Sequence, residues 1–152
     1  PIAAAGAAKR RGFYNGSNLV ASTREQGMSS HFHVPVDVET FYIAAQSDPA
    51  AQRYVFAYTI TIRNLSSDTV QLLSRYWLIT DANGKQTEVA GEGVVGEQPT
   101  LAPGSSYRYT SGAVLDTPVG TMQGHYQMIT STQQRFNAAI PLFRLAMPNI
   151  LN

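Results

Sequence analysis

Apolar and polar side chains alternate along most of the chain after residue 33, with turn-forming residues about every ten to fifteen positions. The clearest run is 54–63, in which Tyr54, Phe56 and Tyr58 fall on one face and Val55 and Ala57 on the other. A period of two is typical of a β-strand that packs one face into a core. The pattern predicts seven strands, over residues 34–45, 54–63, 70–80, 85–89, 107–115, 121–130 and 134–145.

Turn signals separate these runs. Asn83-Gly84 predicts a hairpin because both residue types accept a positive φ angle, and Pro103-Gly104 predicts a turn in which Pro fixes φ before Gly supplies a positive value. Pro141 has no N–H to donate, so the second half of the last run is expected at a sheet edge or a bulge. Helical periodicity is missing throughout. The sequence therefore predicts an all-β fold, a seven-stranded immunoglobulin-like or fibronectin type III-like sandwich.

Length and cysteine content limit the kinds of fold and site that the chain can have, and the distribution of charge divides it into two parts. With 152 residues it should hold one domain, and with no cysteine it excludes disulfide scaffolds, thiolate zinc sites and cysteine nucleophiles. Residues 1–28 lack a strand or helix period and hold four basic side chains against Glu25, whereas the rest has seven basic and nine acidic side chains. We expect residues 1–28 to be a flexible leader or an extension added in cloning, with Met28 as the native start. Residues 29–152 are then the sandwich domain.

The same division decides which partners are expected. The basic excess belongs to the leader and the domain is mildly acidic, so no nucleic-acid partner is expected. No apolar run approaches the roughly 18 residues of a membrane span, and the N-terminal apolar stretch precedes Lys9-Arg10-Arg11, which is the reverse order of a secretory signal. We expect a cytoplasmic protein without a membrane partner.

The most suggestive local string is Gly-Glu-Gly-Val-Val-Gly at residues 91–96, which has the spacing G-x-G-x-x-G. A dinucleotide site needs a helix after the glycines, and Pro99 and Pro103 forbid one here. Two interpretations stay open: a backbone nest that holds a small phosphate anion, or a plain loop whose glycines adopt positive φ. The candidate ligand-binding residues of this loop are Gly91, Glu92, Gly93, Gly96, Glu97 and Gln98, with Arg75 and Arg108 as the cations expected beside an anion.

The chain shows no catalytic signature. Its three histidines, His31, His33 and His125, form no H-E-x-x-H or other clustered ligand motif, and no G-x-S-x-G nucleophile turn occurs. We therefore predict no catalytic residue and no resident cofactor. Weak binding of Mg²⁺ or Co²⁺ by oxygen ligands stays open, from the acidic side chains of Asp37, Glu39, Glu88, Glu92, Glu97 and Asp116.

Several strings in the second half of the chain resemble the ApaG family. They are SRYWLITDANGK at 74–85, GEGVVGEQP at 91–99, LAPG at 101–104, YTSG at 109–112, GTMQGHYQM at 120–128 and IPLFRL at 140–145. The strings occur in the same order as in the family, and the resemblance covers residues 33–147. It implies a fibronectin type III-like sandwich, in agreement with the strand pattern.

The resemblance also carries expectations about function. It implies an association with cobalt resistance and magnesium efflux. It also implies a gene that lies near the gene for a diadenosine tetraphosphatase, as in other members of the family. The same domain is fused into eukaryotic F-box and polymerase-interacting proteins, where it looks like a protein-binding module. It supplies no catalytic residue. Members often have His where this chain has Tyr76, so a metal role for that position is not expected here.

The sequence as a whole predicts a non-enzymatic binding module. Its loop at 91–99 and the adjacent strand faces would be presented to a protein partner or a small anion. Two alternatives from other classes stay open. One is an Mg²⁺-dependent enzyme acting on phosphate or pyrophosphate through Glu92 or Glu97, and the other is a direct binder of divalent cations.

Overall fold

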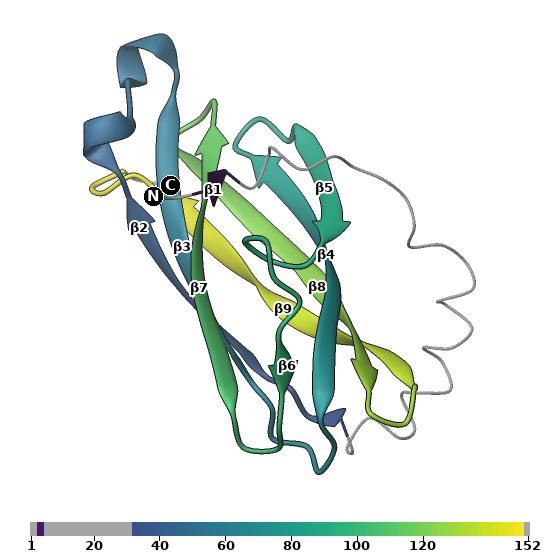
Figure 1. The fold of residues 1–152 in the computed structure, drawn as a ribbon. Coiled ribbons are helices and arrows are strands. Elements are labelled where there is room, and N and C mark those ends of the chain that lie inside the picture. Colours follow the sequence, from purple (N-terminus) through teal and green to yellow (C-terminus); the bar gives the residue numbers. More distant parts are fainter. Residues whose placement is uncertain (1–2, 5–31, 151–152) are drawn as a thin grey trace.

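The computed structural model describes residues 3–4 and 32–150, and it shows two β-sheets packed face to face (Figure 1). The first sheet has the strand order β1-β7-β3-β2, and the second β5-β4-β8-β9, with β6 also paired to β4. The strands of the first sheet are β1 (Ala3–Ala4), β2 (Val36–Tyr42), β3 (Tyr54–Arg63) and β7 (Ser106–Leu115). Those of the second are β4 (Val70–Asp81), β5 (Gln86–Glu92), β6 (Thr100–Leu101), β8 (Val119–Thr130) and β9 (Arg135–Ala146).

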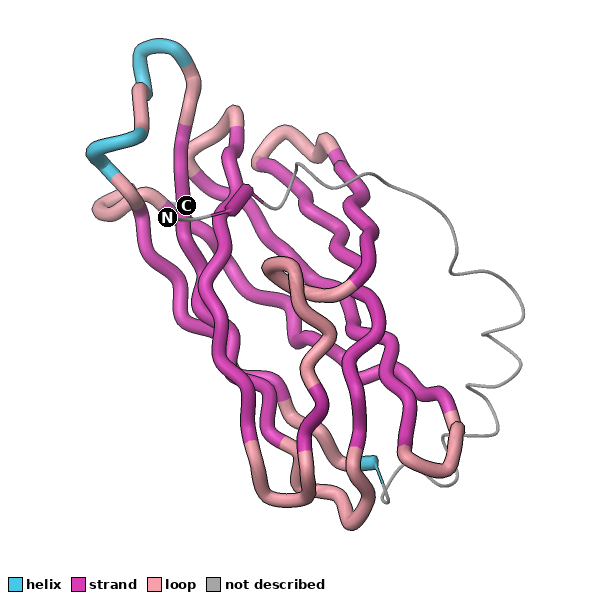
Figure 2. The backbone as a smooth tube through the Cα atoms, viewed as in Figure 1, coloured by secondary structure: helices cyan, strands magenta, loops and turns pink. Residues whose placement is uncertain are grey.

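This architecture confirms the all-β sandwich. Each of the seven expected strands is present, as β2, β3, β4, β5, β7, β8 and β9, and the structure adds the two-residue strands β1 and β6. The first expected strand, 34–45, was too long: β2 ends at Tyr42, because the 3₁₀ turns η3 (Ala44–Gln46) and η4 (Pro49–Ala51) follow it (Figure 2). Within the described residues, no helix is long and apolar enough to cross a membrane.

Aromatic side chains from both sheets meet at the centre of the core. Trp77 of β4 has no exposed surface and makes edge contacts with Tyr58 of β3, at a centroid distance of 5.4 Å, and with Phe143 of β9, at 5.8 Å. Edge-to-face pairs at these distances add to the free energy gained from burial itself. The alternation along β3 and β4 therefore brings one large side chain from each strand into the same inter-sheet space.

Turn residues fix how the strands connect. Gly84 has φ +84° and Asp81 Oδ1 accepts hydrogen bonds from the N–H groups of Asn83 and Lys85, so the β4–β5 hairpin forms as predicted, although Asn83 itself does not take a positive φ. At 102–105, Gly104 has φ +86° and the Ser105 N–H donates to the Ala102 carbonyl, which confirms the expected Pro-Gly turn.

The sandwich has two different sides. On one side β2 and β9 contact each other and join the two sheets. β9 is the outermost strand of its sheet, and its register against β8 shifts where Pro141 and Leu142 lie opposite Gln123 alone. Pro141 is thus at an edge and in a bulge, as predicted. On the other side lie β5, the end of the second sheet, and β7, whose outer edge pairs with β1.

The domain boundary expected at residue 28 falls outside the described residues. Residues 5–31 include Lys9-Arg10-Arg11, Met28 and His31, so the interpretation of residues 1–28 as a leader stays a prediction. The described part of that segment, Ala3–Ala4, pairs in parallel with Ser111 and Gly112 of β7.

Candidate functional site

The glycine-rich string forms the connection from β5 to β6. Gly91 and Glu92 still belong to β5, and the chain then folds into a tight turn in which Val94 N–H donates to the Glu97 carbonyl at 2.8 Å and Glu97 N–H to the Val94 carbonyl at 2.9 Å. The two central residues have positive φ, +42° at Val95 and +83° at Gly96. This is the geometry of a two-residue hairpin turn, which requires positive φ at both centres.

A bulge in β4 holds this loop in place. The register of β4 against β8 shifts between Leu72 and Ser74, and the carbonyl of the intervening Leu73 turns to the loop. It accepts the N–H of Gly93 at 2.8 Å and the side-chain amide of Gln98 at 2.9 Å. A bulge leaves one residue without a ladder partner. Here the loop supplies the missing partners and is thereby tied to the second sheet.

Arg75 makes a further connection between β4 and the loop. Its Nη1 donates to the carbonyl of Glu92 at 3.1 Å and to that of Gly93 at 2.9 Å. A Cβ atom at Gly91 would lie 3.1 Å from the same Nη1, so glycine at 91 leaves room for the guanidinium. The structure therefore places Arg75 beside the loop, with its guanidinium facing loop carbonyls.

The remaining predicted cation is elsewhere. Arg108 of β7 lies opposite Thr61 of β3 and pairs with Glu39 of β2 across the first sheet at 3.7 Å. Its neighbour Tyr107 points the other way and donates to Glu97 Oε1 of the loop at 3.3 Å. Successive residues of a strand face opposite sides. The structure brings Arg75 to the loop and leaves Arg108 on the outer face of the other sheet.

A buried group of tyrosines, Tyr58, Tyr109 and Tyr126, lies between the two sheets. The hydroxyls of Tyr109 in β7 and Tyr126 in β8 are 2.5 Å apart and form a hydrogen bond. Burial raises the pKa of Tyr58 to about 12 and raises the pKa values of Tyr109 and Tyr126 well above their usual range. These hydroxyls stay protonated and act as hydrogen-bonding groups that join the sheets.

Three backbone N–H groups of the loop are engaged within the protein. The amides of Gly93, Val94 and Glu97 donate to carbonyls of the protein itself. A phosphate nest needs several adjacent N–H groups that point at the anion. The exposed side chains of the loop are those of Glu92, Val95, Glu97 and Gln98, and Val95 exposes 44% of its surface.

Other candidate ligands are dispersed. His33 is exposed near the start of the described domain, and His125 stacks on Tyr76 on the outer face of the second sheet, with ring centroids 5.3 Å apart. Tyr76 donates to Glu88 Oε2 at 2.6 Å. Partial burial lowers the pKa of His125, and burial followed by Glu88 raises that of Tyr76 to about 12. Among residues 3–4 and 32–150, no group of three or more His, Asp and Glu side chains is placed to hold a metal ion.

Sequence reasoning missed two parts of this site. The Leu73 carbonyl is one, because a bulge inside an apolar run leaves no compositional mark. The second is the hydrogen bond from Tyr107 to Glu97, because that contact depends on how the two sheets pack against each other. The available signal was the spacing of Leu72 and Trp77, two apolar residues that are an odd number of positions apart, so that strict alternation would put them on opposite faces of the strand.

Comparison with known proteins agrees with the resemblance read from the sequence. A family model described as ApaG domain matches residues 44–130. Protein ApaG of Sodalis glossinidius is 61% identical over 119 residues, 78% of this chain and 95% of that protein. Protein ApaG of an Escherichia coli O1:K1 strain is 60% identical over the same length.

Solved structures show the same fold. The crystal structure of the putative ApaA protein from Bordetella pertussis superposes with a TM-score of 0.76 and 47% identity, over 78% of this chain and 97% of that one. The X-ray structure of a structural genomics target gives a TM-score of 0.74 with 53% identity, over 78% of this chain and 89% of that one. Together with the family match, these similarities show that the chain belongs to the ApaG family.

Proposed function

We propose that this chain is a non-enzymatic binding module that presents the loop at 91–99 to a protein partner. The observation that carries the proposal is the state of the loop: β4 holds it through Leu73 and Arg75, while its tip exposes an apolar side chain, Val95. A tip fixed in one conformation loses little conformational entropy on binding. Val95 also has φ +42°, which is costly for a β-branched residue and is tolerated where function demands it.

The chemistry of the loop favours a protein over an anion. Arg75 is directed to loop carbonyls, three backbone amides are used internally, and two carboxylates, Glu92 and Glu97, flank the tip. An apolar contact with a charged rim is the usual composition of a transient protein interface. The complementary surface on the partner is an apolar pocket rimmed by lysine or arginine. The expected role in cobalt resistance and magnesium efflux would then pass through that partner.

Site-specific photocrosslinking in bacterial cells tests the proposal. A photoreactive phenylalanine analogue replaces Val95 in the full chain, and the control places it at Leu142, an exposed apolar residue of β9 that is 57% accessible. We expect a discrete adduct from position 95 that is missing at 142. Charge reversal of Glu92 and Glu97 to Lys should remove the adduct, whereas the same change at Asp37 and Glu39 on the other sheet should keep it.

Two results would count against the proposal. One is an adduct pattern that is the same at both positions or is indifferent to Glu92 and Glu97. The other is a set of amide shifts at residues 91–96 on titration with millimolar pyrophosphate, in a chain that forms no adduct, because this would assign the loop to a small anion.

A further inference from the structure

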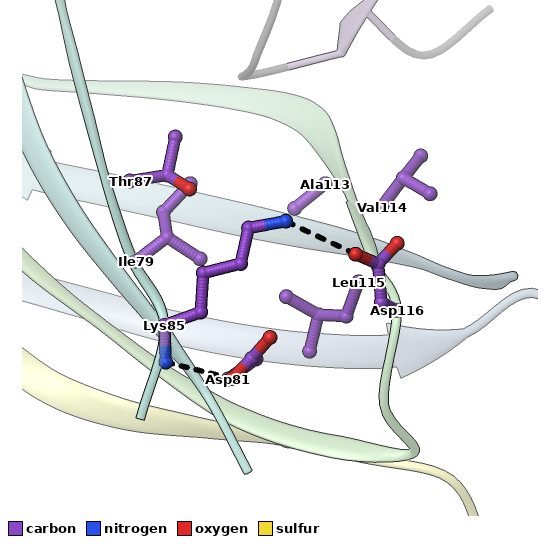
Figure 3. Close-up of a pocket in the computed structure, with 8 residues that line it drawn as sticks. All are labelled: Ile79, Asp81, Lys85, Thr87, Ala113, Val114, Leu115 and Asp116. Atoms are coloured by element: carbon purple, nitrogen blue, oxygen red, sulfur yellow. Dashed lines mark hydrogen bonds and ion pairs between the residues drawn. The ribbon is translucent and has the colours of Figure 1, made fainter. Parts of the chain in front are cut away.

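A second surface lies on the side of the sandwich where β5 ends the second sheet and where β7, with the two-residue β1 at its outer edge, ends the first (Figure 1). Between them is a cavity of about 320 Å³ (Figure 3). Its apolar wall consists of Ile79, Ala113 and Leu115, which belong to the buried core. Thr87 of β5 and Val114 of β7 stand at its exposed margin.

Two contacts hold one end of this cavity. Lys85, next to the β4–β5 hairpin, pairs with Asp116 beyond the end of β7 at 3.1 Å. Nearby, the Ala82 N–H donates to Thr117 Oγ1 at 3.0 Å. Both partners of the ion pair are well exposed, so it contributes little stability, but together the contacts connect the turns of the two sheets. The cavity is therefore already formed without a ligand.

The backbone of β7 beside this cavity has room for another strand. One edge of β7 pairs with β3 over its full length, Ser106–Leu115. The other edge, in the part of the chain that the structure describes, pairs with β1, with Ala3 opposite Ser111 and Ala4 opposite Gly112, in parallel. An extended backbone thus fits at this edge, and the two pairs fix its direction and register.

That register determines where the next side chains of an added strand would point. Along β7, Ser111, Ala113 and Leu115 face the core, while Val114 faces outward with 44% of its surface exposed. Residues opposite each other in a parallel ladder project from the same face of the sheet. The residue opposite Ala113 therefore directs its side chain toward the cavity, two positions after the one opposite Ser111.

We infer that the outer edge of β7 is a binding site for an extended peptide of a partner protein, which adds to the sheet in parallel and places one apolar side chain in the cavity. Backbone hydrogen bonds would supply affinity, and the cavity would supply specificity for the side chain. Ala3–Ala4 occupies the edge in cis and competes with such a peptide. This surface is separate from the loop at 91–99, so a failure of either proposal leaves the other standing.

The test uses the full chain with Ala3→Pro and Ala4→Pro, which remove the N–H groups of β1 and free the edge. The probes are two fluorescent octapeptides, Pro-Ile-Ala-Ala-Ala-Gly-Ala-Ala and the same peptide with Leu as its fifth residue, which the register places opposite Ala113. By fluorescence anisotropy we expect the Leu peptide to bind at least about tenfold more tightly, because it buries an isobutyl group in the cavity. The unmodified chain should bind both peptides more weakly.

A matched pair of variants locates the binding. Thr87→Trp fills the cavity from an exposed position of β5 and should remove the preference for Leu, whereas Gln86→Trp, which projects from the opposite face, should keep it. The proposal is overturned if the Leu peptide does not bind below about 1 mM, or if both Trp variants behave alike. Dimerisation of the double-Pro variant in sedimentation would also overturn it, since a second copy would then be the occupant.

Discussion

At the scale of single residues, each of the three glycines in the loop at 91–99 is required for a different physical reason. Gly91 leaves space for the Arg75 guanidinium. Gly93 has φ +65°, and a Cβ atom there would lie 2.4 Å from the Glu97 carbonyl oxygen. Gly96 has φ +83° and open space around its Cα. Both Gly93 and Gly96 therefore need a left-handed backbone, but only at Gly93 would an added side chain also collide with the backbone of the loop.

We expect Gly93→Ala to destabilise the protein more than Gly96→Ala does. The left-handed backbone costs an L residue about 1–2 kcal/mol at either position. At 93 the new methyl group must also displace the Glu97 carbonyl and break the turn. Urea unfolding followed by circular dichroism measures both losses. Equal losses for the two variants would show that the close approach at Gly93 does not matter.

Single residues also mark the limit of sequence prediction. The glycine string and Arg75 were identifiable by residue type, and positive φ at Gly84, Gly93, Gly96 and Gly104 follows from glycine's freedom. That Arg75 would face carbonyls, and that Arg108 would lie on the outer face of the first sheet, depends on which side of each strand is inward. Strand alternation fixes that side only after bulges are known, and the bulge at Leu73 changes it for Arg75.

At the scale of elements, the loop behaves as part of the second sheet. β5 and β6 pair with different stretches of the same edge of β4, and the loop crosses the gap between them at the β4 bulge. The Leu72 N–H donates to the Pro99 carbonyl at 3.0 Å on the far side of that gap. Alternation in the sequence was sufficient to predict β3, β4 and β8. It was insufficient for β6, because two residues show no periodicity.

Arg75→Met should loosen the loop without unfolding the sandwich. The substitution keeps a long apolar stem but removes both hydrogen bonds to the loop, so two carbonyls lose their partner. We expect amide hydrogen exchange at Val94 and Glu97 to accelerate about tenfold or more, while amides in β3 keep their protection. Arg108→Met, which removes an exposed cation on the other sheet, is the control. Unchanged exchange at Val94 in the Arg75 variant would show that the bulge alone holds the loop.

At the scale of the whole molecule, stability depends on pH through a side chain outside the core. His125 of β8 stacks on Tyr76 of β4, whose hydroxyl donates to Glu88, and partial burial lowers the pKa of His125. In the unfolded chain histidine gains its proton near pH 6.5. In the folded chain His125 is protonated only at a lower pH, because its pKa is lowered. Below about pH 6.5 the unfolded state therefore binds more protons than the folded state, and the free energy of unfolding decreases.

Replacing His125 by Phe should therefore reduce the loss of stability between pH 7.5 and pH 5.5. The aromatic ring keeps the stack on Tyr76 but cannot take up a proton. Urea midpoints at the two pH values, for the unmodified chain and the variant, measure the effect. His33→Gln, which removes an exposed imidazole, should leave the pH response as it was. A response in His125→Phe as large as in the unmodified chain would place the pH dependence elsewhere.

The core tryptophan gives the molecule a built-in optical reporter. Trp77 is the single tryptophan of the chain, it has no exposed surface, and its ring touches Tyr58 of one sheet and Phe143 of the other. Indole fluorescence can be excited apart from that of the eight tyrosines. The wavelength of its emission maximum therefore reports whether the two sheets are packed against each other, without an added label. A peptide strand added at the outer edge of β7 would leave this signal unchanged, whereas any separation of the sheets would shift it to the red.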